Sequence, residues 1–495
     1  MIRGRGARGG AGRAFSLQPV VHIIGLFVTA LGVTMLLPAA VDGYAGHPDW
    51  QVFATASAVT VFCGAAMSLA TAGPIPSLSI HQGFLFTTGV WLAAALAAAV
   101  PLMFAEFNLD FTNAFFEAMS GLTTTGATVV VGLDQAPPGI LLWRSILQWV
   151  GGIGFIVVGL AILPFLQVGG MQLFRLESSE KSEKAVPQAK RFAFLLLSIY
   201  VGLSIACTVA LLLAGMTPLE AVAQAMTTVA TGGFSTSDAS IAHFDSPTIE
   251  AITAVFMLSG SLPFLLYLRF LQGRPDLLLH DEQVRGYIRF LFIVIICFTA
   301  WMVIVAHMPP LEALRFVSFQ VISMATTTAF IATDYSTWGD MPVLVLFLLT
   351  LIGGCSGSTT GALKVFRLDI LYLALRNHIH RLIYPHGTFV AAYNGRQVTD
   401  DVFTGVLLFI GLYMITIAVV GILLALTGLD PVTALSGAAG AVSNSGLGLG
   451  PIIGPTGSFA AVPPAAKWIL ALAMLLGRLE LFTVLALFSR SFWKQ

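Results

Sequence analysis

Long apolar stretches alternate with short polar segments along the whole chain. A helix needs about 20 apolar residues to cross a hydrocarbon core of ~30 Å, and many of these stretches reach that length. The pattern therefore predicts an all-α membrane protein. The expected spans lie at about 18–41, 52–72, 83–105, 140–168, 191–215, 247–271, 286–308, 341–376 (interrupted), 402–427 and 464–489.

Four shorter apolar stretches each follow one of the expected spans. They lie near 111–124, 217–230, 311–327 and 431–443, and at 13 to 17 residues they are too short to cross the membrane. We interpret them as half-helices that enter the membrane and leave it again on the same side.

Composition supports the membrane assignment and excludes several other classes of protein. Apolar residues make up 57% of the 495 residues and charged residues only 10%, whereas soluble domains carry about a quarter charged residues. The net charge is zero, so the balance predicts no nucleic-acid partner. No Walker motif or combination of nucleophile and base is present, and we do not expect an enzyme. A GxGxxG match at Gly4–Gly9 follows no predicted strand, so we reject a dinucleotide site there.

The distribution of charge orients the chain. Of the 24 Lys and Arg residues, 20 lie before residue 18, in 169–191, 269–290 and 364–400, or after residue 489. Cytoplasmic segments carry such an excess, so we expect both termini in the cytoplasm and the half-helices opening outward. The basic start, residues 1–17, is then a cytoplasmic tail.

Each half-helix is followed by a short loop rich in Thr, Ser and Gly. The loops read Thr124-Thr125-Gly126-Ala127, Thr231-Gly232-Gly233-Phe234, Thr327-Thr328-Ala329-Phe330 and Asn444-Ser445-Gly446-Leu447. Two full spans separate successive half-helices, so all four enter in the same direction and predict parallel repeats around a pore with pseudo-fourfold symmetry. The expected segments are 1–17, an N-terminal two-helix segment at 18–82, and the repeats 83–190, 191–282, 283–400 and 401–495.

The loops have the chemistry of an ion filter. A cation that enters a pore exchanges its water for carbonyl or hydroxyl oxygens, and irregular backbone is tolerated in a membrane where it lines a cavity. Taken singly, each loop could instead be an ordinary helix C-cap. Because four loops occupy matching positions, we favour a filter. Its expected residues are Thr124, Thr125, Gly126, Thr231, Gly232, Gly233, Thr327, Thr328, Ala329, Asn444, Ser445 and Gly446.

Two further features suggest a constriction below this filter. The 341–376 stretch is broken at 353–362 by Gly353, Gly354, Gly357, Ser358, Thr359, Thr360 and Gly361, a composition that disfavours continuous helix. We expect a gating loop there, with close helix packing as the alternative. Arg478 lies inside the last span, where a charge needs a cavity or a partner. Pairing with backbone carbonyls is its structural alternative, and Glu480 is expected on a different helix face.

Several segments resemble pore proteins of the Trk/Ktr/HKT superfamily, and the two extra N-terminal spans resemble its TrkH branch. The segments that resemble the superfamily are PPGILLWRSILQWVGGIGFIVVGLAILPFLQVGGMQLFR (137–175), ATGGFSTSD (230–238), GGCSGSTTGALKVFR (353–367), AVSNSGLGLGP (441–451) and MLLGRLELFT (474–483). Three positions depart from the family pattern. Ala329 replaces a usual glycine, the loop 358–362 is poorer in glycine, and Leu447 replaces a frequent proline.

The resemblance implies potassium uptake through a gated, channel-like pore in the inner membrane. It also implies a homodimer and a cytoplasmic TrkA-type nucleotide-binding ring, so that nucleotide acts only through this partner and potassium is substrate rather than cofactor. Gly126 matches the potassium-selective branch, and Arg478 corresponds to a positive barrier in the conduction path. Basic segments at 175–191, 269–289 and 364–381 are expected to dock the ring.

Two other functions remain open from the residues. A sodium- or proton-coupled potassium symporter would need a carboxylate inside the membrane, and Glu480 is the candidate. A membrane scaffold without transport would leave the four matching loops unexplained.

Overall fold

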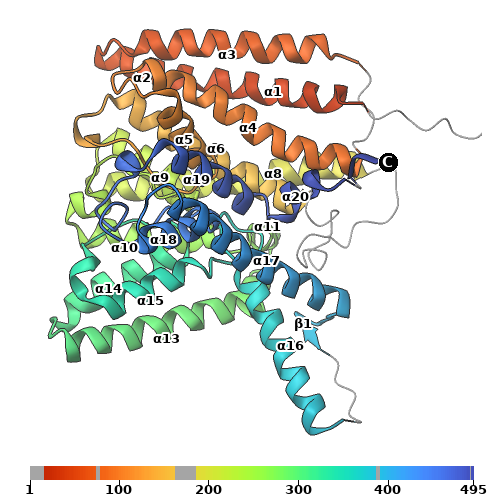
Figure 1. Ribbon diagram of the computed structural model, residues 1–495. Coiled ribbons are helices and arrows are strands. Elements are labelled where there is room, and N and C mark those ends of the chain that lie inside the picture. Colours follow the sequence, from red (N-terminus) through yellow and green to blue (C-terminus); the bar gives the residue numbers. More distant parts are fainter. Residues whose placement is uncertain (1–15, 74–78, 162–184, 386–390, 491, 495) are drawn as a thin grey trace, which may run out of the picture.

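The computed structural model describes residues 16–73, 79–161, 185–385, 391–490 and 492–494. Long helices run side by side, and shorter helices lie among them (Figure 1). The described strands are β1 (Ala392–Tyr393) and β2 (Arg396–Gln397), which form one antiparallel hairpin. Residues 1–15 of the predicted basic tail and residues 169–184 of the predicted basic segment lie outside the described residues.

Seven of the predicted spans are present as single long apolar units. Their outward side chains are apolar, including Phe62 at 73%, Leu213 at 84% and Ile304 at 71% exposed, which places these surfaces against lipid. The helices are α1 (Gln18–Thr34) with α2 (Leu36–Ala45), α3 (Trp50–Ala70), α4 (Ile80–Phe104), α6 (Pro138–Ala161), α8 (Ala185–Leu213), α13 (Glu282–Val305) and α17 (Asp400–Ala425).

Two of the predicted continuous spans are wrong in shape, because each is sharply bent. The 247–271 stretch folds as α10 (Pro247–Ser261) and α11 (Phe264–Leu271), which meet at 94°. Pro263 lies at this break. The helix does not continue through it because proline lacks the backbone N–H that the next helical hydrogen bond needs. The last stretch folds as α19 (Pro464–Arg478) and α20 (Phe482–Leu485), with an angle of 106°.

The predicted interruption of the 341–376 stretch is confirmed. α15 (Asp340–Thr350) ends well before α16 (Val365–Ile383), and residues 351–364 between them are not helical. α16 runs away from the bundle, with β1 beside it (Figure 1). The hairpin packs on both α16 and α17 through an apolar cluster that includes Phe366, Ile370, Tyr393 and Val402.

The four predicted half-helices are present within two residues of the expected bounds. They are α5 (Phe111–Leu122), α9 (Pro218–Val229), α14 (Pro310–Ala325) and α18 (Pro431–Val442). Local sequence explains where they begin. Asp110, Thr217 and Asp430 each accept a hydrogen bond from the first turn of the helix that follows, and proline occupies the start of α9, α14 and α18.

The chain thus forms an N-terminal pair of helices and four repeats of helix, half-helix, loop and helix. A large apolar cluster joins α1 and α3 to the first and fourth repeats, while the second and third repeats have clusters of their own. The remaining described elements are short: α12 (Asp276–His280) and the 3₁₀ helices Leu133–Gln135, Ser240–Phe244, Tyr335–Trp338, Phe459–Ala461, Ala486–Phe488 and Phe492–Lys494.

Candidate functional site: four loops around one cavity

The four loops after the half-helices share one backbone shape. Their first residues are left-handed, with φ of 51° at Thr124, 50° at Thr231, 56° at Thr327 and 52° at Asn444. This region is uncommon for residues other than glycine, so four matching instances reflect a repeated structure. Two residues later the backbone is left-handed again in each loop, at positions 126, 233, 329 and 446.

Each half-helix ends in the same capping motif. The N–H of Thr125 donates to Ser120 O at 2.8 Å and that of Thr124 to Gly121 O at 2.9 Å, the paired bonds of a Schellman cap. Equivalent pairs of bonds close the other three half-helices, with donors at 231 and 232, 327 and 328, and 444 and 445. The loops are therefore helix C-caps, as the alternative interpretation held, and they are also repeated at matching positions.

The loops approach one another closely. A Cβ added to Gly126 would overlap with Gly232 O, and one added to Gly446 would overlap with Thr125 O. Similarly, a Cβ on Gly233 would overlap with Thr328 O. All four loops line one cavity of about 260 Å³, which we call the vestibule. Its lining includes Gly126, Gly233, Thr328, Ala329, Ser445 and Gly446.

Ala329 follows the backbone of the glycines at its equivalent positions. Its φ is 60°, close to the 64° of Gly446. A side chain at such a φ costs about 1–2 kcal/mol, because Cβ crowds the neighbouring carbonyl. The replacement of glycine in the third loop therefore leaves the shape of the loop unchanged and adds local strain.

The predicted gating loop, residues 353–362, packs against the second, third and fourth loops. The hydroxyl of Thr231 donates to the Thr359 hydroxyl at 3.1 Å, and Gly361 N donates to the Thr327 hydroxyl at 3.0 Å. Ala362 N donates to Ser443 O at 2.9 Å, just before the fourth loop. The predicted gate residues of this loop are all buried: Gly353, Gly354, Gly357, Ser358, Thr359, Thr360 and Gly361.

Arg478 and the gating loop are in direct contact. The Arg478 Nη1 donates to Thr359 O at 2.9 Å, and its Nη2 lies 3.4 Å from Gly151 O. The guanidinium stacks on Phe155, with Cζ 4.2 Å from the ring centre. Arg478 is the last residue of α19, so the middle of the last predicted span is a break between two helices and not continuous helix.

The prediction that Glu480 occupies a different face of the same helix is also wrong, because the helix ends before it. Glu480 and Leu481 have φ of 60° and 47°, and they form the bend itself. The Glu480 carboxylate instead pairs with Arg367, and it lies 3.9 Å from the Lys364 Nζ. Among the described residues, no ion pair reaches Arg478. The cations Lys364, Arg367 and Arg478 and the carboxylate of Glu480 are each at most 3% exposed. Together these four side chains carry a formal excess of two positive charges.

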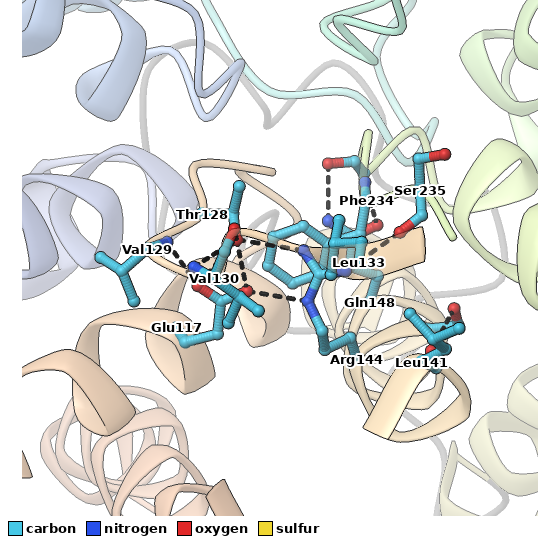
Figure 2. A network of polar contacts seen from close by, with 12 residues as sticks. Glu117, Thr128, Val129, Val130, Leu133, Leu141, Arg144, Gln148, Phe234 and Ser235 are labelled. Carbon is cyan, nitrogen blue, oxygen red and sulfur yellow. Dashed lines mark hydrogen bonds and ion pairs between the residues drawn. The ribbon is translucent and has the colours of Figure 1, made fainter. Parts of the chain in front are cut away.

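A second buried charge network borders the vestibule, which Arg144 lines (Figure 2). Arg144 Nε donates to Glu117 Oε1 at 2.8 Å, and both side chains are buried. The carboxylate also accepts from Val129 N at 2.8 Å and from the Thr128 hydroxyl at 2.9 Å. Arg144 Nη1 donates to Ser235 O at 3.0 Å. The pair therefore connects the first loop with the second.

Gln148, one turn along α6 from Arg144, holds the second loop directly (Figure 2). Its Nε2 donates to Gly232 O at 2.6 Å and its Oε1 accepts from Phe234 N at 3.0 Å. A Cβ on Gly232 would overlap with this side-chain amide. The absence of a side chain at position 232 is thus required by a side chain from a different helix.

Sequence reasoning missed Glu117, Arg144 and Gln148. A signal was present for two of them, since Arg144 lies in a predicted span and Glu117 in a predicted half-helix, where unpaired charges are costly. Glu480 is therefore not the only carboxylate buried among the described membrane helices. The pairing itself joins residues 27 positions apart on separate helices, which periodicity does not reveal.

Comparisons with known proteins agree with this arrangement. The profile of a family described as TrkH, cation transport protein, matches residues 49–495. The chain is 44% identical to the Trk system potassium uptake protein TrkI of Halomonas elongata, over 96% of this chain and 97% of that protein. It is 39% identical to TrkH of Vibrio parahaemolyticus, over 96% and 99%. The crystal structure of the potassium transporter TrkH from Vibrio parahaemolyticus matches with a TM-score of 0.90 and 35% identity, over 97% of this chain and 100% of that chain.

Proposed function

The chain belongs to the TrkH family of cation transport proteins, and we propose that it takes up potassium across the cell membrane through a gated, channel-like pore. The four loops form the filter, and the substrate is the potassium ion itself. The named relatives are potassium uptake proteins of Trk systems, which supports the choice of ion. The filter residues are the twelve expected from the sequence: 124–126, 231–233, 327–329 and 444–446.

The observation that carries the proposal is the repeated left-handed backbone of the four loops around one cavity. Such loops turn backbone carbonyls toward a common centre, where they replace the water of a cation without adding fixed charge. Each half-helix also directs its C-terminal, partly negative end toward the loops, which favours a cation there.

Arg478 and residues 353–362 act together as the gate. The hydrogen bond between Arg478 and Thr359 O supports a single unit, because movement of the loop would move the partner of the arginine. The excess of positive charge in this layer opposes the passage of a cation. Opening requires the loop to leave this position, and a partner can shift that equilibrium if the two states differ by a few kcal/mol.

The gate is controlled from the cytoplasm by a TrkA-type nucleotide-binding ring that docks on a homodimer in the inner membrane. Both chain termini then lie in the cytoplasm. Arg274, Arg285 and Arg289 are exposed on the expected docking side. Neutralising these three residues together will weaken binding of the ring and its dependence on salt. Unchanged binding would assign them to membrane topology alone.

Ion flux in liposomes that contain the purified protein tests the proposal. Gradients of potassium, rubidium, sodium or lithium are imposed separately, with no other ion gradient present. We expect potassium and rubidium to pass without a second coupled ion, and sodium and lithium to pass more slowly. Equal rates for all four ions would contradict the filter.

The same experiment separates the pore from a coupled symporter. A symporter would move potassium only when a sodium or proton gradient is supplied. Glu117 and Glu480, the buried carboxylates beside the four loops and the proposed gate, are both engaged by arginine, which favours the uncoupled pore. Potassium flux that vanishes without a sodium or proton gradient would overturn this part of the proposal.

A further inference from the structure

The four half-helices differ at one buried position behind the loops. Seven residues before each left-handed Thr or Asn, the sequence has Glu117, Gln224, Gln320 and Gly437. All four positions are buried. Only the first repeat places a charged side chain here.

Neutral side chains at or beside this position make a simple version of the contact. Gln320 Oε1 accepts from Ala332 N at 3.1 Å, as Glu117 accepts from Val129 N, and both donors lie five residues after the left-handed residue. In the fourth repeat the hydroxyl of Ser436 accepts from Leu449 N at 2.7 Å. A polar side chain of the half-helix thus holds the backbone segment that leaves the loop in the first, third and fourth repeats.

In the first repeat, the side chain of Arg144 additionally reaches the loop of the second repeat. Arg144 is held by Glu117, and its remaining nitrogens donate to Ser235 O and, at 3.2 Å, to the Thr128 hydroxyl. Its guanidinium also stacks on Phe234, with Cζ 4.1 Å from the ring centre. The guanidinium therefore lies between the backbone segments that leave loops one and two (Figure 2).

This bridge spans the point where those two loops meet. Gly126 and Gly232 are in backbone contact immediately beside it. An ion pair buried in a medium of low dielectric keeps its geometry, since either charge alone would be costly. The planar guanidinium also fixes the directions of its donors, which a lysine cannot do.

We infer that Glu117 and Arg144 are positioning residues that set the spacing of the first and second loops and thereby the selectivity of the pore for potassium over sodium. The inference rests on the proposed function. The pair acts through Ser235, Thr128 and Val129, and it makes the filter stiffer between loops one and two than elsewhere.

The test compares ion flux in liposomes for the full-length wild-type protein and for Arg144→Lys. Lysine keeps the charge beside Glu117 but loses the planar donors to Ser235 O and Thr128. We expect the ratio of potassium to sodium flux to fall roughly threefold to tenfold, the effect of one or two weakened hydrogen bonds to a charged group. A merely structural role would lower the amount of folded protein and leave this ratio unchanged.

Arg315→Lys is the matched control. Arg315 also forms a two-point pair with a buried carboxylate, at 2.6 and 2.8 Å from Glu250, and it joins α14 to α10. Neither residue lines the vestibule. We expect the wild-type flux ratio in this variant. An equal fall in both variants would overturn the inference, because any arginine pair would then have the same effect.

A double variant, Glu117→Gln with Arg144→Met, decides the matter if Arg144→Lys does not fold. Removing both charges avoids a buried unpaired ion, and such replacements are commonly tolerated. We expect a folded protein with a reduced flux ratio. A wild-type ratio in either folded variant, beside a selective wild-type protein, overturns the inference alone. A wild-type protein that does not select potassium overturns the proposed function, and the inference falls with it.

Discussion

Arg144 and Arg478 are both buried beside the four loops, but their surroundings differ. Arg144 borders the vestibule and is paired with Glu117. Arg478 is not among the residues that line the vestibule; it lies against the predicted gating loop, and its hydrogen bonds go to the carbonyls of Thr359 and Gly151. Carbonyls satisfy the donors of a guanidinium without cancelling its charge.

The difference teaches that burial of a charge and its electrical effect are separate matters. A neutralised arginine at the mouth of a cation pore leaves the approaching ion undisturbed. In the proposed pore, an arginine that keeps its charge opposes the ion, and the pairing of Glu480 with Arg367 and Lys364 leaves this carboxylate engaged elsewhere. We therefore assign Arg144 to the filter framework and Arg478 to the gate.

The largest expected effect is on stability. Arg144→Ala leaves the Glu117 carboxylate buried without its cation, and breaking a buried pair in this way costs about 3–5 kcal/mol. Thermal unfolding in detergent, followed by tryptophan fluorescence, measures the loss. Arg315→Ala provides the comparison, because it also removes the cation of a buried carboxylate, but Arg315 itself is 26% exposed and the loss should therefore be smaller. Equal losses would show that the Glu117 pair is not a special framework element.

Glu117→Gln makes Arg144 resemble Arg478, because it restores an uncompensated charge at the vestibule. Glutamine retains the shape and can still accept from Val129 N. A charge about 10 Å from an ion at an effective dielectric of ~20 contributes between one and two kcal/mol, so potassium flux should fall about tenfold. Flux is measured in liposomes at equal protein content. If flux is unchanged, the pairing does not serve to neutralise the vestibule.

Gly126→Ser tests the filter that lies between the two arginines. The added Cβ would overlap with Gly232 O, so loops one and two must separate slightly to make room for it. Sodium permeability relative to potassium should rise about fivefold, a change of ~1 kcal/mol. Reversal potentials in mixed potassium and sodium solutions report the ratio. A well-folded variant with a wild-type ratio would argue against the filter assignment.

Ala329→Gly is expected to have the smallest effect. Glycine relieves the strain of the left-handed backbone but gains entropy in the unfolded chain, so the net stabilisation is about 0.5–1 kcal/mol. The midpoint of thermal unfolding should rise slightly, with selectivity for potassium unchanged or improved. A lower midpoint would mean that the Ala329 methyl group makes packing contacts that outweigh the strain.

Much of the fold could be predicted from the sequence because the membrane imposes simple lengths. Apolar stretches of about 20 residues became spans, and stretches of 13 to 17 residues became the half-helices α5, α9, α14 and α18. The four loops were found because Thr, Asn and Gly recur at the same distance after each half-helix. Their common left-handed backbone gives this recurrence a physical reason.

The two sharp bends were not predicted, since an apolar run does not reveal its direction. Pro263 was a signal for the first bend. The second occurs at Glu480 and Leu481, which have no intrinsic preference for a left-handed backbone. Glu480 is held there by pairing with Arg367, more than 100 positions away, and such a contact exists only in the folded chain.

Potassium flux through Arg478→Ala in liposomes, without any cytoplasmic partner, tests the central claim most directly. Removal of the uncancelled charge should raise basal flux about tenfold, whereas Arg478→Lys, which keeps the charge, should remain near the wild-type rate. Selectivity for potassium over sodium should persist in both variants, because the filter is intact. Wild-type basal flux in a well-folded Arg478→Ala protein would contradict the account and make this arginine a structural residue.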